Sequence, residues 1–431
     1  MSAVNRSIGV WGAFVAVHFL LGWICLGMPG TGIGELALGL PLGDVTLVYR
    51  PWVLQALGDD GVPGLSEPWV YPIAALLPLF AAMVAGPDNY GVTWLVLVAL
   101  LSAMALAVLL GRGTSPRRRA SAWWWIAFTA ALGPIAVARI DAITVPLAIV
   151  ALLLVAQHPR IGGTLLALAT WIKVWPAALI GGLLLASTRR WTVCVAGVVT
   201  SVVLAAVAMG AGGGAHLLSF VTEQTGRGLQ IEAPVATPYL WLAAAGVESS
   251  SIYYSTDILT FQVAGPNVDT VAAIMTPLLA LAVTATALIG ARAVRLGAPV
   301  VRVLPPLLLA LVVTLQLFHK VGSPQFLTWL IAPIVLGIVW RGRGYTVPAA
   351  IALGLAALTH LVYPYLYFRL LAADPVLVAV LTARNLGYVV LLGWALHAVL
   401  TAHRRPAALG SDSSSPSGVT MAPGTEQHTE E

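Results

Sequence analysis

Residues 8–28, IGVWGAFVAVHFLLGWICLGM, contain no aspartate, glutamate, lysine or arginine. A helix that crosses a bilayer needs about 20 mostly apolar residues, so this run predicts a membrane-spanning helix. Further along, residues 41–52 read PLGDVTLVYRPW, in which the carboxylate of Asp44 precedes an amphipathic segment. Together the two stretches predict a membrane protein with a polar group at the membrane surface.

The composition of the whole chain agrees with this prediction. Of its 431 residues, 59% are hydrophobic and 9% are charged, which excludes an ordinary soluble globular protein. The apolar runs are continuous rather than alternating, which disfavours a β-barrel. The sequence has no Walker loop, dinucleotide fingerprint or zinc-ligand spacing. We therefore expect no cofactor, no metal and no nucleic-acid partner.

Apolar segments recur along the chain and are separated by basic loops. Since lysine and arginine accumulate on the cytoplasmic side, the loops place both termini in the cytoplasm. The segment 71–86 is short and carries Pro78, and a crossing there would break the alternation, so we expect a re-entrant or interfacial helix. The sequence predicts an all-α polytopic membrane protein with 12 spanning helices, at 8–28, 91–111, 121–138, 141–156, 161–172, 174–187, 191–209, 269–291, 303–318, 324–340, 345–362 and 386–402.

The remaining segments divide into outer loops and a tail. Residues 29–90 and 210–268 form two long outer loops, and 363–385 form a third outer stretch with an interfacial helix. Seven of the 22 basic residues, and all carboxylates before the tail, fall on the outer side, so we expect extracytoplasmic chemistry. Residues 1–403 thus form one transmembrane domain, and the Ser-, Pro- and Gly-rich tail at 404–431 is predicted to be disordered and cytoplasmic.

Two charged residues lie where a charge is costly. The aromatic residues Tyr49 and Trp52 suit the headgroup level, so Asp44 before them is placed to act on a lipid headgroup, with helix capping as the alternative.

Lys173, in LALATWIKVWPAALIGG, joins apolar segments of 12 and 14 residues, too short for the ~30 Å hydrocarbon core. It should lie below the outer surface, where ionisable residues are functional candidates. A snorkelling lysine or a structural pair with Asp141 is the alternative.

Two further clusters fall on outer turns. Arg139 and Asp141 in ARIDAITV are two positions apart and do not share a helical face, so a turn-fixing pair and a ligand role both stay open. In FHKVGSPQFLTW, His319 is next to Lys320 and close to Gln325, and histidine could serve as an acid, a base or a phosphate donor, or be a bystander.

The second long loop contains EQTGRGLQIEAP. The glycines on both sides of Arg227 would let the backbone approach a ligand closely. Gln230 and Glu232 provide amide and carboxylate groups of the kind that bind sugar hydroxyls.

Taken together, these stretches resemble the GT-C superfamily of glycosyltransferases. GDVTLVYRPW resembles its acidic first-loop motif. WVYPIAALLPL, which contains Tyr71, resembles the aromatic-Tyr-Pro-Pro helix that follows, with Ile73 in place of the second proline. RIDAITVPLAIVAL, LALATWIKVWPAAL, RGLQIEAP and KVGSPQFLTWLIAP are similar, in order, to elements of family 87, the actinobacterial transferases that use polyprenyl-phosphate sugars. The likeness spans roughly 40–340.

The resemblance implies a GT-C fold in the cell membrane and an inverting transfer of mannose from polyprenyl-phospho-mannose. The acceptor would be a glycolipid, phosphatidylinositol mannoside or lipomannan, and the product an α-mannoside. Asp44 would be the general base, with His319 as the second catalytic candidate. Basic residues would hold the phosphate, whose departure needs little protonation. The donor and substrate contacts would come from Tyr71, Arg139, Asp141, Lys173, Arg227, Gln230, Glu232, Lys320 and Gln325.

Two alternatives remain open. An arabinofuranosyltransferase that uses polyprenyl-phospho-arabinose would keep the mechanism and change the sugar. A lipid or sugar transporter would also carry intramembrane charges and broken helices. The long outer loops, the one-sided polar candidates and the lack of a repeat favour the transferase.

Overall fold

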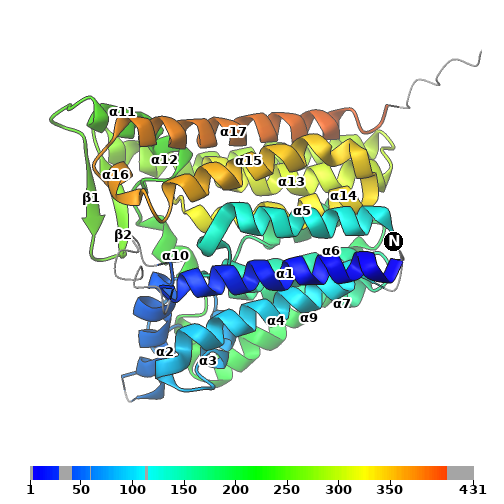
Figure 1. The fold of residues 1–431 in the computed structure, drawn as a ribbon, viewed down its shortest axis with the longest axis horizontal. Coiled ribbons are helices and arrows are strands. Elements are labelled where there is room, and N and C mark those ends of the chain that lie inside the picture. Colours follow the sequence, from blue (N-terminus) through cyan, green and yellow to red (C-terminus); the bar gives the residue numbers. More distant parts are fainter. Residues whose placement is uncertain (1–2, 29–40, 59, 112–114, 405–431) are drawn as a thin grey trace, which may run out of the picture.

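The computed structural model describes residues 3–28, 41–58, 60–111 and 115–404. Within them the chain forms one bundle of helices that run side by side (Figure 1). The predicted tail at 404–431, apart from its first residue, and part of the first outer loop lie outside the described residues.

Helix forms at each of the twelve ranges predicted to span the membrane. The sequence reason is the same throughout: long apolar runs broken by glycine or proline at the turns. Proline at the first helical position begins several of them, as is typical of helix starts. The twelve are α1 (Ala3–Cys25), α4 (Tyr90–Leu110), α5 (Pro116–Leu132), α6 (Asp141–Leu154), α7 (Pro159–Ile172), α8 (Ala177–Ala186), α9 (Arg190–Gly210), α12 (Val268–Arg295), α13 (Val300–Phe318), α14 (Ile331–Arg341), α15 (Thr346–Val362) and α17 (Pro375–Leu400).

The helices differ in length. Among the described residues, seven helical stretches are long and apolar enough to cross a membrane. Helices α6 and α8 are apolar but have 14 and 10 residues, so at ~1.5 Å per residue they fall short of the ~30 Å core. The prediction of an all-α polytopic membrane protein is confirmed, and the number of crossings stays a prediction.

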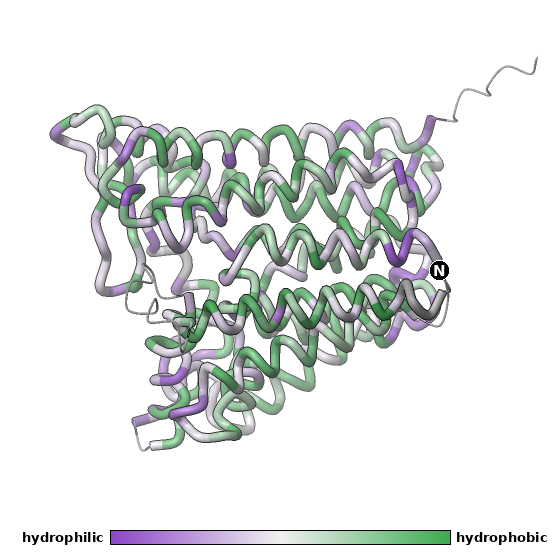
Figure 2. Tube along the Cα trace, viewed as in Figure 1, coloured by the Kyte–Doolittle hydropathy of each residue, from purple (hydrophilic) through white to green (hydrophobic). Residues whose placement is uncertain are grey.

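The surface of the bundle suits a lipid environment. Apolar residues follow the helices, and hydrophilic residues gather at the ends (Figure 2). Helix α9 exposes a valine face that includes Val195, Val199 and Val203. By contrast, α13 is the central helix, with nearly every side chain from Val303 to Val313 buried.

The short elements gather at one end of the bundle, opposite the end where α1 begins and α17 ends (Figure 1). Both ends of the described chain thus lie at the same end of the bundle, as an even number of crossings requires (Figure 1). The short elements come from the predicted outer loops. They are a helical turn (Asp44–Tyr49) that continues into α2 (Arg50–Leu57), α3 (Leu76–Ala81), α10 (Ser219–Thr225), α11 (Thr237–Ala244), α16 (Tyr367–Leu371) and an antiparallel hairpin of β1 (Ser251–Ser255) and β2 (Thr260–Ala264).

One predicted boundary is wrong. The sequence predicts the last spanning helix at 386–402, but α17 begins at Pro375, and the interfacial helix predicted within 363–385 is reduced to α16. The physical reason is a strong start signal: the Asp374 side chain accepts hydrogen bonds from the backbone N–H groups of Val376 and Leu377. As a consequence, Arg384 lies inside a long helix rather than on a surface helix.

Candidate active site

The end that carries the short elements contains a cavity of about 520 Å³, within the usual range for a ligand site. Its lining comes from distant parts of the chain, including the first outer loop, the turn before α6, the second outer loop and the turn after α13. Nine of the eleven predicted site residues line it: Asp44, Tyr71, Arg139, Lys173, Arg227, Gln230, Glu232, His319 and Gln325.

Helix ends supply the charged side chains. Lys173 follows α7 and His319 follows α13, each in extended backbone where the helix stops. Helix α5 ends before Gly133, which has φ +74° and lies so close to the His360 ring that a Cβ would collide with it. The chain then turns through Arg139 into α6. The positions where these helices end and begin therefore bring the charged residues to the cavity.

Asp44 and Arg139 form the first ion pair of the site. Arg139 Nε lies 2.9 Å from Asp44 Oδ2. The Nη1 group of Arg139 donates to the carbonyls of Pro41 and Ala138 at 2.6 and 2.8 Å, and Nη2 donates to the Tyr363 hydroxyl at 3.0 Å. Four of its five N–H groups are thus engaged. Burial opposes the charge, but Asp44, Tyr363 and Tyr49 keep the pKa of Arg139 above its ordinary value. Arg139 is therefore fixed in place and fixes Asp44.

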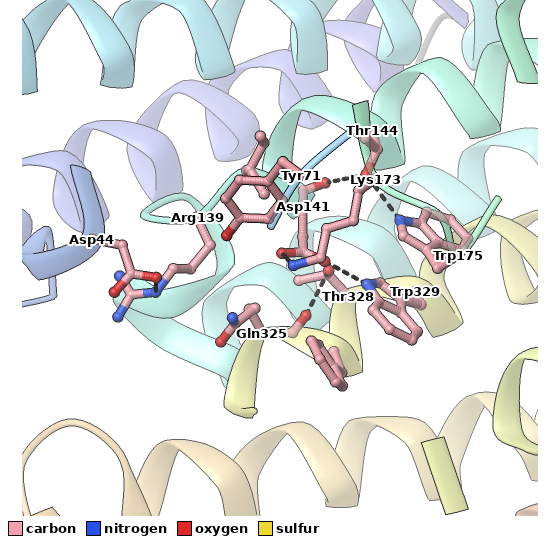
Figure 3. A network of polar contacts seen from close by, with 12 residues as sticks. Asp44, Tyr71, Arg139, Asp141, Thr144, Lys173, Trp175, Gln325, Thr328 and Trp329 are labelled. Atoms are coloured by element: carbon pink, nitrogen blue, oxygen red, sulfur yellow. Dashed lines mark hydrogen bonds and ion pairs between the residues drawn. The ribbon is translucent and has the colours of Figure 1, made fainter. Parts of the chain in front are cut away.

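Lys173 and Asp141 form the second ion pair (Figure 3). Lys173 Nζ donates to Asp141 Oδ2 at 2.8 Å, and Trp329 Nε1 donates to Oδ1 at 2.5 Å. Asp141 has no exposed surface and does not line the cavity, whereas Lys173 does. The ammonium group also lies over the rings of Tyr71 and Phe326, 5.6 and 5.2 Å from their centroids. Asp141 thus orients Lys173 from behind the cavity wall.

The expected alternative of a local Arg139–Asp141 pair does not occur. Each residue instead pairs with a charge from another part of the chain, Arg139 with Asp44 and Asp141 with Lys173. The reason is the one that the spacing suggested: residues two positions apart at a helix start point in different directions.

Stacked aromatic side chains support Lys173. Trp329 stacks on Trp175 with ring centroids 5.7 Å apart and on Phe326 at 4.2 Å. Trp175 Nε1 donates to the Thr144 hydroxyl at 2.9 Å. Trp329 lies in a 3₁₀ segment, Pro324–Leu330, which takes up the start of the helix predicted at 324–340.

His319 faces the cavity as a neutral ring. Its Nδ1 lies 2.9 Å from the backbone nitrogen and 3.1 Å from the carbonyl oxygen of Val321, so the backbone of Val321 offers a partner to either ring tautomer. Burial, reinforced by nearby Lys320, Arg227 and Lys173, lowers the pKa of His319 to about 4. The neutral ring can form hydrogen bonds but carries no charge near neutral pH.

The loop that carries Gln230 and Glu232 is clamped against the turn after α13. The Gln230 N–H donates to the Lys320 carbonyl at 3.1 Å. A Cβ on Gly322 would lie 2.1 Å from the Ala233 nitrogen, so glycine is required for this close approach. Two segments about ninety positions apart in sequence thereby form one wall.

Arg227 and Lys320 mark a second cavity. It measures about 600 Å³, and Arg227, Glu223 and Asp257 line both cavities. Lys320 lines the second cavity and not the first. Among the described residues, Arg227 forms no hydrogen bond or ion pair, and no cluster of histidine, cysteine, aspartate and glutamate could hold a metal ion.

Sequence reasoning missed several residues of the site. Arg384 pairs with Glu232, and Tyr363 bonds to Arg139. Arg384 is a charge within a long helix, a signal that would have marked it if the start of α17 had been placed correctly. The others are aromatic. Tyr49 and Trp52, which the sequence places at the headgroup level, line the cavity, as do three residues without a distinctive signal: Trp175, Trp329 and Tyr367.

Comparison with known proteins gives one match. The model of glycosyltransferase family 87 matches residues 69–247, so the chain is similar to that family over this segment. No curated protein and no solved structure matches the chain. The matched segment contains Lys173, Arg227 and Glu232, whereas Asp44 and His319 lie outside it. The match supports a glycosyltransferase of the GT-C type.

Proposed function

From this match and the geometry of the cavity, we propose that the chain is an inverting mannosyltransferase of the cell membrane. The donor is polyprenyl-phospho-mannose and the acceptor is a mannosylated lipid or glycan, phosphatidylinositol mannoside or lipomannan. The cavity lies on the extracytoplasmic side. The observation that carries the proposal is a fixed carboxylate, Asp44, in one cavity with cations and hydroxyl-binding groups.

Asp44 is the general base of this reaction. Its side chain is 38% exposed, so a substrate can reach the carboxylate from the cavity. Arg139 holds Oδ2, and Oδ1 forms no hydrogen bond with the described residues. An acceptor hydroxyl can therefore approach Oδ1 and lose its proton there.

The bond changes then balance without a second catalytic carboxylate. The acceptor oxygen, having given its proton to Asp44, attacks the anomeric carbon of the donor. The bond from that carbon to the phosphate oxygen breaks, and polyprenyl phosphate leaves with the electron pair. Attack from the face opposite the phosphate converts a β-linked donor into an α-linked product.

Lys173 and Arg227 supply the positive charge that the leaving phosphate needs. The Lys173 ammonium group has three N–H donors, and one is used on Asp141. Arg227 is flanked by glycines and has no ion partner among the described residues. The neutral ring of His319 adds a further hydrogen-bonding group. Preorganised donors of this kind stabilise charge as it develops.

The assay that tests this proposal compares purified wild type with Asp44→Asn in detergent, with polyprenyl-phospho-mannose and phosphatidylinositol-mannoside acceptors. Asp88→Asn, an exposed carboxylate outside the cavity, is the matched control. We expect a loss of ~10²–10⁴ in rate for Asp44→Asn and none for Asp88→Asn.

Each other outcome is informative. Full activity in a folded Asp44→Asn variant removes the base role from Asp44. A wild type that uses polyprenyl-phospho-arabinose and ignores the mannose donor makes it an arabinofuranosyltransferase. A wild type that moves an intact lipid-linked sugar across a vesicle membrane and forms no new glycosidic bond is a transporter.

A further inference from the structure

A buried ion pair links the second outer loop to the last long helix. Arg384 Nη1 lies 3.3 Å from Glu232 Oε2, and Arg384 Nη2 donates to the backbone carbonyl of Glu232 at 2.8 Å. Both side chains are 2% exposed. Removing two charges from water carries a large desolvation penalty, so a buried pair is weak evidence of a role in stability alone. A role in binding would account for it.

The position of the pair supports such a role. Glu232 lines the cavity that contains Asp44 and Lys173, and Arg384 does not. Arg384 contacts both the carboxylate and the backbone of the same residue, so it sets the direction of the Glu232 side chain. On the other side of this loop, Gly322 contacts the backbone of Glu232 and Ala233. The loop is thus held from two sides, with Glu232 between them.

One carboxylate oxygen is left for a ligand. Among the described residues, the hydrogen-bond partner of Glu232 is Arg384, through Oε2, and Oε1 forms no hydrogen bond. Tyr367, which also lines the cavity, lies close enough for the Glu232 charge to affect its ionisation. An anchored carboxylate beside an aromatic ring is a typical way to bind a sugar, since the ring covers an apolar face and the carboxylate accepts from hydroxyls.

We propose that Glu232 binds a sugar hydroxyl of the substrate through Oε1, and that Arg384 is the positioning residue that aims it. The inference rests on the proposed transferase function and specifies its substrate contact: a neutral hexose ring that offers a hydroxyl to a fixed carboxylate. It assigns a task to a helix outside the segment that matches the glycosyltransferase family.

The test is a double-substitution cycle in the full chain. The variants are Glu232→Gln, Arg384→Met and the two combined, with Asp374→Asn as the control, because Asp374 forms an exposed pair with Arg369 at the same end of the bundle. Because Asp374 also begins α17, Asp88→Asn, at an exposed carboxylate outside the cavity, is the control for stability. Each variant is assayed for the thermal unfolding midpoint, and for kcat and KM toward donor and acceptor. Arg384→Met leaves a buried carboxylate without its partner, so its midpoint falls; the combined variant buries no unpaired charge and regains the midpoint.

The activities distinguish binding from folding. We expect the combined variant, although stable, to keep a kcat/KM roughly 10- to 100-fold below wild type, the range for a lost hydrogen bond to a charged group. The loss should be mainly in KM for one of the two substrates. The difference in KM between the combined variant and the wild type should also be smaller for a substrate analogue that lacks the hydroxyl that Glu232 binds.

A combined variant with both wild-type stability and wild-type kinetics would show that the pair serves folding alone, and would overturn the inference while leaving the proposed function intact. A wild type that transfers no sugar from any polyprenyl phosphosugar contradicts the proposed function, and the inference falls with it.

Discussion

His319 shows how burial can decide the chemistry of a residue. Because burial lowers its pKa to about 4, the ring is neutral throughout the physiological range. The sequence leaves an acid, a base and a phosphate donor open, and the structure favours a neutral hydrogen-bonding group. The signal in the sequence is the residue type, whereas the burial that decides its charge comes from the packing of distant segments.

We predict that His319 contributes no limb to the pH profile of kcat/KM between pH 6 and 8. His319→Gln, which keeps an N–H donor, should lower the rate and leave the shape of that profile unchanged. Measuring both profiles across this pH range checks the prediction. A limb near pH 6.5 that is present in the wild type and lost in the variant would contradict it.

We predict instead that the ionisation of Glu232 produces a limb in the pH profile of kcat/KM. Burial raises its pKa from 4.5 to about 7, against the opposing effects of Arg384 and Arg139. The groups that face it are Arg384 and Tyr388 from α17, Tyr367 from α16 and Arg139 before α6. If the ionised form binds the sugar, kcat/KM rises as the pH rises through about 7, and Glu232→Gln lacks this rise.

The same ionisation of Glu232 has the opposite effect on the stability of the fold. The pKa of Glu232 is higher in the folded than in the unfolded chain, so the fold is favoured below about 4.5, and that advantage is lost as the pH rises through about 7. For activity, a Glu232→Gln variant whose kcat/KM still rises through about pH 7, as in the wild type, would contradict the prediction.

Arg139 is a further case in which a residue keeps its place in the site and changes its expected task. It was expected to hold the donor phosphate, but four of its N–H groups are already engaged. We predict that Arg139→Lys, which keeps the charge and loses the planar fork, reduces kcat/KM roughly 10- to 100-fold with little change in KM for the donor. Arg369→Lys, at an exposed pair, is the control. A rise in donor KM with unchanged kcat would restore the phosphate role.

At the scale of elements, the sequence predicts where helices exist better than where they begin. Continuous apolar runs predict all twelve helices of the bundle, because a helix in lipid must satisfy its backbone internally. The start of α17 was missed because a local signal, Asp374 followed by Pro375, extends the helix beyond its most apolar part. The contact between the second outer loop and the turn after α13 leaves no periodic signal, and it depends on one glycine.

We predict that Gly322→Ala disrupts the site through this contact. The added methyl group would overlap the backbone of Glu232 and Ala233, so one of the two segments must move. Because this wall carries Gln230 and Glu232, activity should fall at least about tenfold, the effect of ~1.4 kcal/mol. Gly354→Ala in α15, where a Cβ meets nothing within 4 Å, is the control and should keep full activity. Wild-type kinetics in Gly322→Ala would show that the contact is not critical.

At the scale of the whole molecule, the sequence predicts at which end of the bundle the charged residues lie. It does not predict which acidic side chain forms an ion pair with which basic one. The positive-inside pattern and the short helices indicated that the candidate residues lie at one end, and the structure gathers nine of them around one cavity. Which acid meets which base depends on how distant segments pack. Asp44 pairs with Arg139, Asp141 with Lys173, and Glu232 with Arg384 across 95, 32 and 152 positions.

The side of the membrane that this cavity faces is the property on which the lipid-linked donor depends. Glu248 lies in the exposed turn between α11 and β1, and Thr188 in the exposed turn between α8 and α9, which are at opposite ends of the bundle. Arg189 and Arg190 follow Thr188, so the positive-inside tendency places that turn in the cytoplasm. We predict that, in a chain without Cys25 and Cys194, Glu248→Cys reacts with a membrane-impermeant maleimide in intact cells, and Thr188→Cys reacts only after permeabilisation. Detergent-solubilised protein, in which both sites should react, is the control. The reverse labelling pattern would place the cavity, with Asp44 and its ion pair, on the cytoplasmic side, where nucleotide sugars would compete with lipid-linked ones as donors.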